Sequence, residues 1–261
     1  MNEKATAEFE IKVSGGRITK AQVMPDGSCK VMVELVTGVT LNTCTTQNDV
    51  FVKVPASELS LADEFMKYEP KTTAERRFKE KVEKAIKGGL KDFYHPKYDP
   101  SLSEDGTSIC YVPGKKPAVG KSYNWWAKVA KEFNPERKSR LGTKTEYIAF
   151  LAVLIKMLVD SGKSVEWAWN AVCNDSKKLG HYWNSENAKH AFEDTGSREI
   201  CGWCDLANAC KILAEDEEAG GFWLAGGICF DGSNSNPLAD LYHSYYRNNG
   251  NFHGCGWLVL S

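Results

Sequence analysis

The residues with the strongest potential for chemistry are nine cysteines and five histidines. Cys201, Cys204 and Cys210 include a Cys-x-x-Cys spacing, which is typical of zinc and redox sites. No fourth ligand stands at a characteristic distance, and the histidines show no His-x-x-x-His spacing. We therefore expect buried free thiols, with zinc binding as the alternative. The chain also lacks a nucleophile elbow, a P-loop and a dinucleotide motif. We expect no enzymatic activity, no bound metal and no cofactor.

A second kind of chemistry, surface recognition, is indicated by the composition of residues 228–255, which we call the window. Its 28 positions contain no Lys, Glu, Gln, Met or Trp, although these types make up 62 of the 261 residues. At that usage about six or seven would be expected. The window is rich in Tyr and Phe, which offer contact area at low entropic cost, and in Ser, Asn and Gly, which offer adaptable hydrogen bonds. This composition favours ligand binding over a merely polar loop.

The same composition has a genetic meaning. Random changes to the first two bases of an Asn codon can never produce the five missing residue types. We therefore expect the window to hold hypervariable positions whose side chains contact a ligand. These positions are Ile228, Cys229, Phe230, Asp231, Ser233, Asn234, Ser235, Tyr242, His243, Ser244, Tyr245, Tyr246, Arg247, Asn248, Asn249, Asn251, Phe252, His253 and Cys255.

Apolar segments on both sides of the window must position it. Residues 221–227 precede it, and residues 256–261 follow it with a Trp-Leu-Val-Leu sequence that predicts a buried strand. An apolar island at 237–241 interrupts the window, and we interpret it as an anchor in the core. The window is therefore expected to form loops held between two core strands.

The order of motifs in the C-terminal half resembles a known family. Gly202-Trp203-Cys204-Asp205-Leu206-Ala207-Asn208 is followed by Gly226-Gly227 and then by Gly256-Trp257-Leu258. This order is similar to that of formylglycine-generating sulfatase-modifying domains, whose motifs run Gly-x-x-Asp-Leu/Met-Ala-Gly-Asn, Arg-Gly-Gly-Ser-Trp and Gly-Phe-Arg. Asn208 stands where that family has Gly, and the Arg and Ser-Trp around Gly226-Gly227 are missing. The window makes the resemblance more specific, to variable proteins of diversity-generating retroelements, in which adenine-specific mutagenesis rewrites C-terminal lectin-fold loops.

The resemblance implies an α+β protein. It comprises a C-terminal C-type-lectin fold, with two helices and a mixed or antiparallel sheet, after a small β-rich N-terminal domain. The function implied is ligand binding by a hypervariable display protein of a phage or cell surface, whose partner is a protein or glycan on a target cell. The scaffold residues implied are Gly202, Asp205, Leu206, Asn208, Trp223, Gly226, Gly227, Leu238, Asp240 and Trp257. Two alternatives stay open: a formylglycine-generating type of oxidase that holds copper with Cys229 and Cys255, and a purely structural virion protein.

Periodicity divides the chain into three expected regions. Residues 1–68 alternate in hydrophobicity over 7–13 and 30–36, with a turn at 25–27, which predicts a β-rich anchoring or oligomerisation domain. Residues 69–119 are expected to be a connector, with a charged helix over 72–88 that acts as a solvated spacer or stalk. The stretch over 93–120 is expected to be either an irregular connector or the first loops of the display domain. Residues 120–261 are the expected display domain, with helices over 144–158, capped near Thr143, and over 164–173. Most of the eight tryptophans are expected in the core.

Charge and hydropathy narrow the classes of partner. The formal net charge of −1 indicates no bulk attraction to nucleic acid. No apolar run reaches transmembrane length, so we expect no membrane insertion. We expect no signal peptide from the residues at the N-terminus of the sequence. We expect synthesis in the cytoplasm, incorporation into a virion such as a phage tail or display on a cell surface, and association into a homo-oligomer.

Overall fold

The computed structural model describes residues 16–23, 29–35, 40–46, 49–179, 195–196, 199–206, 211–215, 222–225, 237–244 and 254–261. Within these ranges the chain forms four α-helices and several small sheets, most of them antiparallel. The fold class is therefore α+β, as the sequence predicts.

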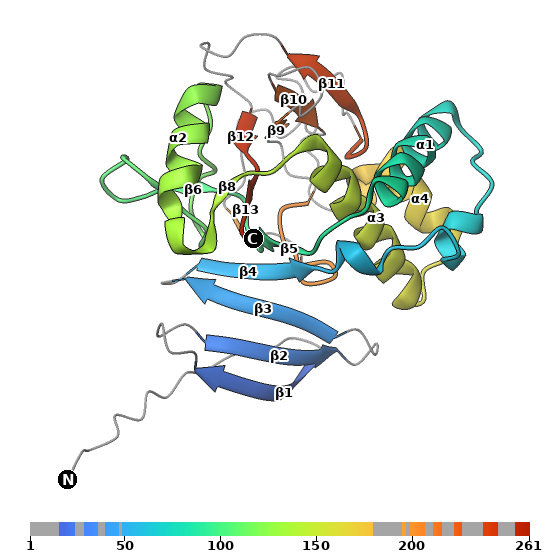
Figure 1. The fold of residues 1–261 in the computed structure, drawn as a ribbon, viewed down its shortest axis with the longest axis horizontal. Coiled ribbons are helices and arrows are strands. Elements are labelled where there is room, and N and C mark those ends of the chain that lie inside the picture. Colours follow the sequence, from blue (N-terminus) through green and yellow to red (C-terminus); the bar gives the residue numbers. More distant parts are fainter. Residues whose placement is uncertain are drawn as a thin grey trace.

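The first sheet has five antiparallel strands in the order β1-β2-β3-β4-β5. They are β1 (Gly16–Val23), β2 (Cys29–Leu35), β3 (Thr40–Thr46), β4 (Asp49–Val54) and β5 (Phe93–Pro96). The strand expected over 30–36 is confirmed as β2, whereas the strand and the turn expected at 7–13 and 25–27 lie outside the described residues. Figure 1 shows β4 and β5 beside the helical body, with β1 farthest from it.

The four helices are α1 (Thr73–Gly88), α2 (Tyr123–Phe133), α3 (Lys144–Asp160) and α4 (Val165–Cys173). Short 3-10 helices lie at Ala56–Glu58, Glu64–Lys67, Pro135–Arg137 and Ser176–Leu179. The predictions of α1, α3 and α4 are confirmed. Helix α2, which begins after the Ser122 cap, was not predicted, so the described residues after 120 include three α-helices where two were expected. None of the helices in the described part of the chain is both long and apolar enough to span a membrane.

Two capping boxes fix where α1 and α3 begin. The Glu75 and Glu146 amides donate to the hydroxyls of Thr72 and Thr143, and each glutamate accepts from the amide of its threonine in return. Glu146 also receives two hydrogen bonds from the Arg140 guanidinium, at 2.6 and 2.8 Å. This bidentate pair joins the start of α3 to β8 (Arg140–Leu141).

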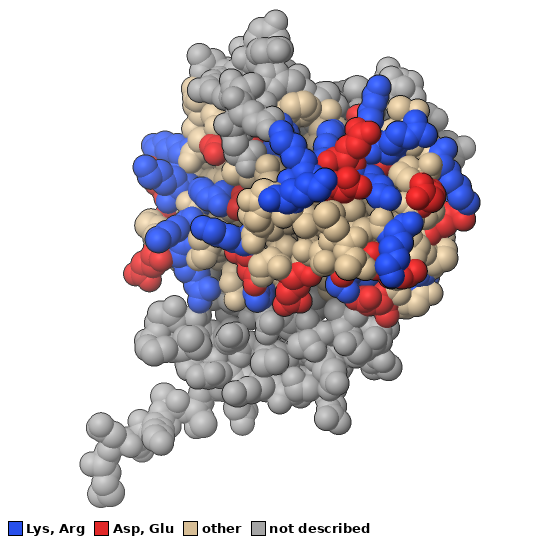
Figure 2. Space-filling view, turned by 45° about the vertical axis from the view of Figure 1, so that its right-hand side comes forward, with Lys and Arg blue, Asp and Glu red and all other residues tan. Residues whose placement is uncertain are grey.

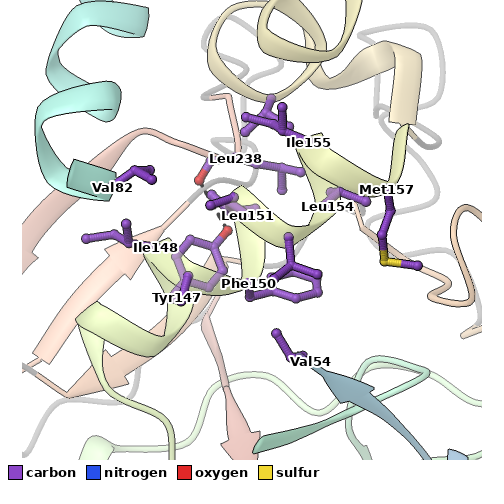
Figure 3. Packing of buried hydrophobic residues seen from close by; sticks show 14 of the residues in the cluster. Val54, Val82, Tyr147, Ile148, Phe150, Leu151, Leu154, Ile155, Met157 and Leu238 are labelled. Atoms are coloured by element: carbon purple, nitrogen blue, oxygen red, sulfur yellow. Dashed lines mark hydrogen bonds between the residues drawn. The ribbon is translucent and has the colours of Figure 1, made fainter. Parts of the chain in front are cut away.

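Helix α3 is the centre of the main core. It is apolar on nearly all sides, which is typical of a helix enclosed by other elements. Figure 3 shows Val82 of α1 and Val54 of β4 near its side chains, so elements that are distant in sequence meet at α3.

This shared core contains residues from all three of the expected regions. Phe78 and Val82 of α1 are 1% exposed, so the helix expected as a solvated spacer buries one face against α3 and α4. The stretch expected as an irregular connector supplies β5, whose pairing with β4 and contact with α3 place it in the same body. From β4 onward, the described residues pack together, with no break in packing at the expected boundaries near residues 68 and 119.

The second sheet has the order β11-β10-β9-β12. Its strands are β9 (Lys211–Glu215), β10 (Phe222–Ala225), β11 (Leu241–Ser244) and β12 (Gly254–Gly256). Strand β12 runs parallel to β9, and the other pairs are antiparallel. Two further pairs are β6 (Ser101–Leu102) with β7 (Ile109–Cys110), and β8 with β13 (Leu258–Val259). The predicted buried strand near the C-terminus is confirmed as β13.

Gly256 permits a close approach between β12 and α2. A Cβ added there would lie 2.5 Å from Cε3 of the buried Trp126, whereas a Cβ on Gly88, at the end of α1, would meet nothing within 4 Å. We predict that Gly256→Ala lowers the free energy of unfolding by about 1–3 kcal/mol through overpacking. Gly88→Ala should raise it by about 0.4–1 kcal/mol, because it restricts the unfolded chain. Urea denaturation measures both, and equal effects of the two substitutions would contradict this packing.

Candidate functional site

The window is flanked by strands of the second sheet: β10 precedes it, and β12 contains its last two residues. Strand β10 ends at Ala225, which pairs with both Leu241 at the start of β11 and Ile212 near the start of β9. Gly254, where β12 starts, pairs with the neighbouring Lys211. The segment between β10 and β11 therefore starts and ends at one end of the sheet. The segment between β11 and β12 leaves β11 at Ser244, which pairs with Phe222 at the opposite end, and returns at Gly254. A rigid sheet that carries connections of this kind is how scaffolds present adaptable loops.

Three of the predicted variable residues, Tyr242, His243 and Ser244, form the backbone of β11. Most of the others lie outside the described residues, namely Ile228, Cys229, Phe230, Asp231, Ser233, Asn234, Ser235, Tyr245, Tyr246, Arg247, Asn248, Asn249, Asn251, Phe252 and His253. The predicted scaffold residues Asn208, Gly226 and Gly227 also lie outside them.

Cys255 is a correction to the predicted variable surface. Its side chain is 0% exposed and belongs to a core cluster with Trp126, Leu141 and Leu258. A side chain enclosed in this way cannot contact a ligand, so the prediction that placed Cys255 among the ligand-binding residues is wrong. Residue composition does not reveal which face of a strand a side chain occupies. The Cys255 side chain lies on the face of β12 that is directed into the core.

The island inside the window is anchored in the main core, as predicted. Leu238 is 5% exposed, and its carbonyl accepts a hydrogen bond of 3.1 Å from the Tyr147 hydroxyl of α3, drawn in Figure 3. The Leu238 amide donates to the Ser176 hydroxyl at 2.9 Å, and the Ala239 amide donates to the Val172 carbonyl. Asp240 is exposed, and its amide donates to the Pro237 carbonyl, so this scaffold residue belongs to a turn.

Trp257 fixes the C-terminal boundary of the window. Its ring is 2% exposed and packs edge-on against Phe93 and Tyr147, with ring centroids 5.8 and 5.4 Å away. The backbone amide of Gly142 donates to the Trp257 carbonyl. A Cβ on Gly142 would lie 2.1 Å from the Trp257 ring. Trp257, the second residue after the window, is therefore locked between β5, α3 and the end of β8.

The motif 202–206 holds loops together through a buried carboxylate. Asp205 is 4% exposed and has a φ of 61°. Its carboxylate accepts from the amides of Asp99 and Gly196 at 3.0–3.1 Å. Gly202 is buried with a φ of 91°, a conformation that glycine adopts without strain, and Leu206 is half-buried against the main core. These contacts support the scaffold role predicted for the motif.

Titratable residues also surround a small cavity in the core. His95, Asp99, Tyr111, Asp205 and Trp257 are among the residues that line it, and its volume is only ≈ 30 Å³. Among the described residues, none lies within hydrogen-bond distance of Tyr111 Oη or Trp257 Nε1. A cavity of this size accommodates about one or two waters that could satisfy such groups, but not an organic substrate. The cluster is therefore structural in character.

His95 is enclosed by aromatic rings. Its imidazole lies 4.5 Å from the Phe150 ring and 5.1 Å from the Trp257 ring, measured between centroids. Nδ1 is 2.6 Å from the Pro96 carbonyl oxygen, which can only accept, so Nδ1 carries the proton and donates. Burial lowers the pKa of His95 to about 3, although the hydrogen bond to Pro96 acts in the opposite direction. The ring is therefore neutral near pH 7.

The Cys-x-x-Cys pair consists of free thiols. Cys201 and Cys204 form no disulfide, and burial raises the pKa of each thiol to about 12. A thiol with such a pKa is protonated near neutral pH, whereas metal binding and disulfide exchange need the thiolate. Two of the three cysteines that suggested a zinc or redox site thus favour the buried-thiol interpretation; Cys210 lies outside the described residues.

Several residues that contact the segments supporting the window, which we call its frame, were not predicted from the sequence. Tyr147 and Ser176 contact the backbone of Leu238, and the Lys97 carbonyl accepts from the amide of Cys204. The one available signal was Tyr147, a hydroxyl-bearing residue in an otherwise apolar helix, because a buried Tyr normally has a hydrogen-bond partner. The Ser176 hydroxyl accepts from a backbone amide, and the Lys97 contact joins two backbone groups. Backbone groups carry no sequence signature.

No family model matches the chain, and neither curated proteins nor solved structures show a significant similarity to it. The likeness to formylglycine-generating domains and retroelement variable proteins rests on the sequence motifs and the window, and it enters below as a proposal.

The lowered pKa of His95 predicts a dependence of stability on pH. Below pH 6.5 the unfolded chain binds a proton at His95 that the folded chain does not bind until about pH 3. This histidine should therefore lower the free energy of unfolding by about 1.4 kcal/mol for each pH unit as pH falls below 6. Urea denaturation between pH 6.5 and pH 5 measures the slope. The difference between the parent and His95→Phe isolates its contribution, and identical slopes would contradict the buried, neutral imidazole.

Thiol accessibility gives a second prediction. Cys173 and Cys204 are buried with raised pKa values, and the reactive species is the thiolate. In native protein at pH 8, iodoacetamide should modify these two residues at least about 100-fold more slowly than in 8 M urea. Peptide mass mapping resolves each site. Native labelling of Cys204 at the rate of the unfolded chain would restore the zinc or redox interpretation.

Proposed function

We propose that this protein is a ligand-binding display protein whose C-terminal loops are diversified by a retroelement through adenine-specific mutagenesis. In this proposal the part of the chain from about residue 120 onward has a C-type-lectin fold. The ligand is a protein or glycan on a target cell surface. The protein acts on a phage particle or at a cell surface, and it catalyses no reaction.

The observation that carries the proposal is the contrast between the window and its anchors. The window lacks five common residue types. The elements that interrupt and follow it, Leu238 and Trp257, are 5% and 2% exposed and pack on α3. A diversified sequence needs such an arrangement, because loops tolerate substitution where the residues that support them belong to a separate core.

The chemistry of the window suits a surface whose specificity changes. Tyr and Phe anchors supply most of the energy in many interfaces, and Ser, Asn and His at their rim adapt to different partners. One sequence represents one sampled specificity. Since association costs on the order of 4–15 kcal/mol in lost freedom, several copies on one particle would add avidity to modest single-site affinity. The N-terminal sheet is the part that we propose for attachment or assembly into a homo-oligomer.

Population sequencing tests the proposal at its genetic basis. Sibling genes should differ at codons for Phe230, Tyr242, Tyr245 and Asn249, with the differences traceable to template adenines. The codons for 237–241 and 256–257 should stay fixed, because those residues anchor the frame. A reverse-transcriptase gene and a near-copy of the window's coding segment should lie nearby. Uniform variation across both classes of codon, with no such near-copy, would contradict the proposal.

A further inference from the structure

A second cavity, separate from the small one in the core, opens between α1, the start of α3 and β10. Its volume is ≈ 400 Å³, within the range of pockets that hold small organic ligands. The residues that line it are Lys81, Lys84, Ala85, Gly88, Gly89, Lys144, Thr145, Ile148 and Trp223. All of them lie outside the window, so they would be shared by every diversified sibling.

The pocket concentrates positive charge. Three of the lining residues that the structure describes are lysines, and none of these described lining residues is acidic. Burial is the main cause that lowers the pKa of Lys81, and the nearby ammonium of Lys144 lowers it further. Exposed Asp240 acts in the opposite direction from outside the lining. No carboxylate lies within ion-pair distance of the Lys81 amine in the parts of the chain that the structure describes. An anion beside Lys81 would offset its repulsion by Lys144.

This charge is local to the pocket. Figure 2 shows Lys and Arg interspersed with Asp and Glu over the face that it presents, and the net charge of the chain is −1. A long polyanion would meet both signs of charge along such a surface. A small ligand with one or two acidic groups would meet the lysines among the described lining residues of the pocket. Lys144 and Thr145 also begin α3, where the helix dipole favours negative charge.

The pocket also has an apolar wall. Ala85 and Ile148 are buried, and the half-buried indole of Trp223 has Lys144 Nζ 4.8 Å from its ring centroid. An aromatic surface beside ammonium groups suits a ligand that has an apolar face next to an acidic group. A sugar ring substituted with a carboxylate or sulfate has this combination, since its C–H face is apolar and its acid group accepts charge-assisted hydrogen bonds.

We propose that the pocket formed by Lys81, Lys84, Lys144 and Trp223 is a fixed binding site for an acidic sugar residue bearing a carboxylate or a sulfate. The site touches the diversified sheet, because Trp223 pairs with His243 of β11. Every sibling would thus hold the same charged sugar while its window determined what else is contacted. The pocket's own residues carry the inference, so it does not depend on diversification of the window.

Isothermal titration of the full chain tests the site with defined probes. Sialyllactose and a sulfated heparin disaccharide are the acidic sugars, and lactose is the neutral control. We expect at least one acidic sugar to bind with one site per chain and lactose to show no binding. Loss of a charge-assisted hydrogen bond in Lys81→Gln should weaken binding about tenfold or more. The matched Lys87→Gln, on an exposed residue of the same helix outside the pocket, should leave affinity within about twofold.

The remaining arms separate other occupants. Trp223→Leu should weaken sugar binding, because it removes the aromatic surface. Inorganic sulfate, tested alone with the parent protein, should bind at least about tenfold more weakly than the sulfated sugar. Equal affinity for sulfate and sugar, equal binding of an acidic peptide, or no binding by either acidic sugar would overturn the proposal. A variant with Tyr245, Tyr246 and His253 changed to Ser should keep sugar binding. Failure of the sugar site therefore remains distinguishable from failure of the display proposal, which population sequencing tests.

Discussion

The packing around Trp257 is the interaction on which the rest of the structure depends. Its indole contacts Phe93 of β5 and Tyr147 of α3 and lies against Gly142, so one side chain joins the C-terminal strand to the first sheet and the central helix. A buried Trp of this kind contributes several kcal/mol, on the order of 3–5 for its truncation to Ala. The window is therefore followed, two residues later, by a side chain that the fold requires. Leu238 plays the corresponding part in the window's interior, because its backbone is held by Tyr147 and Ser176.

These two anchors would allow the proposed diversified segment to coexist with a stable fold. Native stability is a small difference between large terms, so a protein that accepts many sequences must keep the variable positions out of its core. The packing from β4 to the C-terminus meets this requirement through α3, whose side chains are enclosed by α1, α4 and β4. Cys255 shows the limit of a boundary drawn from composition alone: it has a residue type of the predicted variable set, yet it is buried beside Trp126 and Leu141.

Local signals made part of this structure predictable. Threonine caps and apolar periodicity placed α1 and α3, and the Trp-Leu-Val-Leu run placed β13. Long-range pairing was not predictable, because nothing near Phe93 indicates that it pairs with Val54 nearly 40 residues earlier. Helix α2 was missed because two adjacent tryptophans follow a stretch rich in Pro and Gly, which conceals the helical period. The basic pocket was missed because its lysines come from two helices whose contact only the fold defines, whereas the window could be recognised because its signal is compositional.

The central claim is that the frame folds independently of what the window contains. It is tested most directly by the free energy of unfolding of one variant in which Tyr245, Tyr246, Phe252 and His253 are all replaced by Ser, measured by urea denaturation beside Leu238→Ala. The account predicts that the fourfold variant stays within about 1 kcal/mol of the parent, as solvent-facing substitutions do. It predicts that Leu238→Ala alone costs about 2–5 kcal/mol. A fourfold variant that loses as much stability as Leu238→Ala would contradict the claim, because the window would then be part of the core.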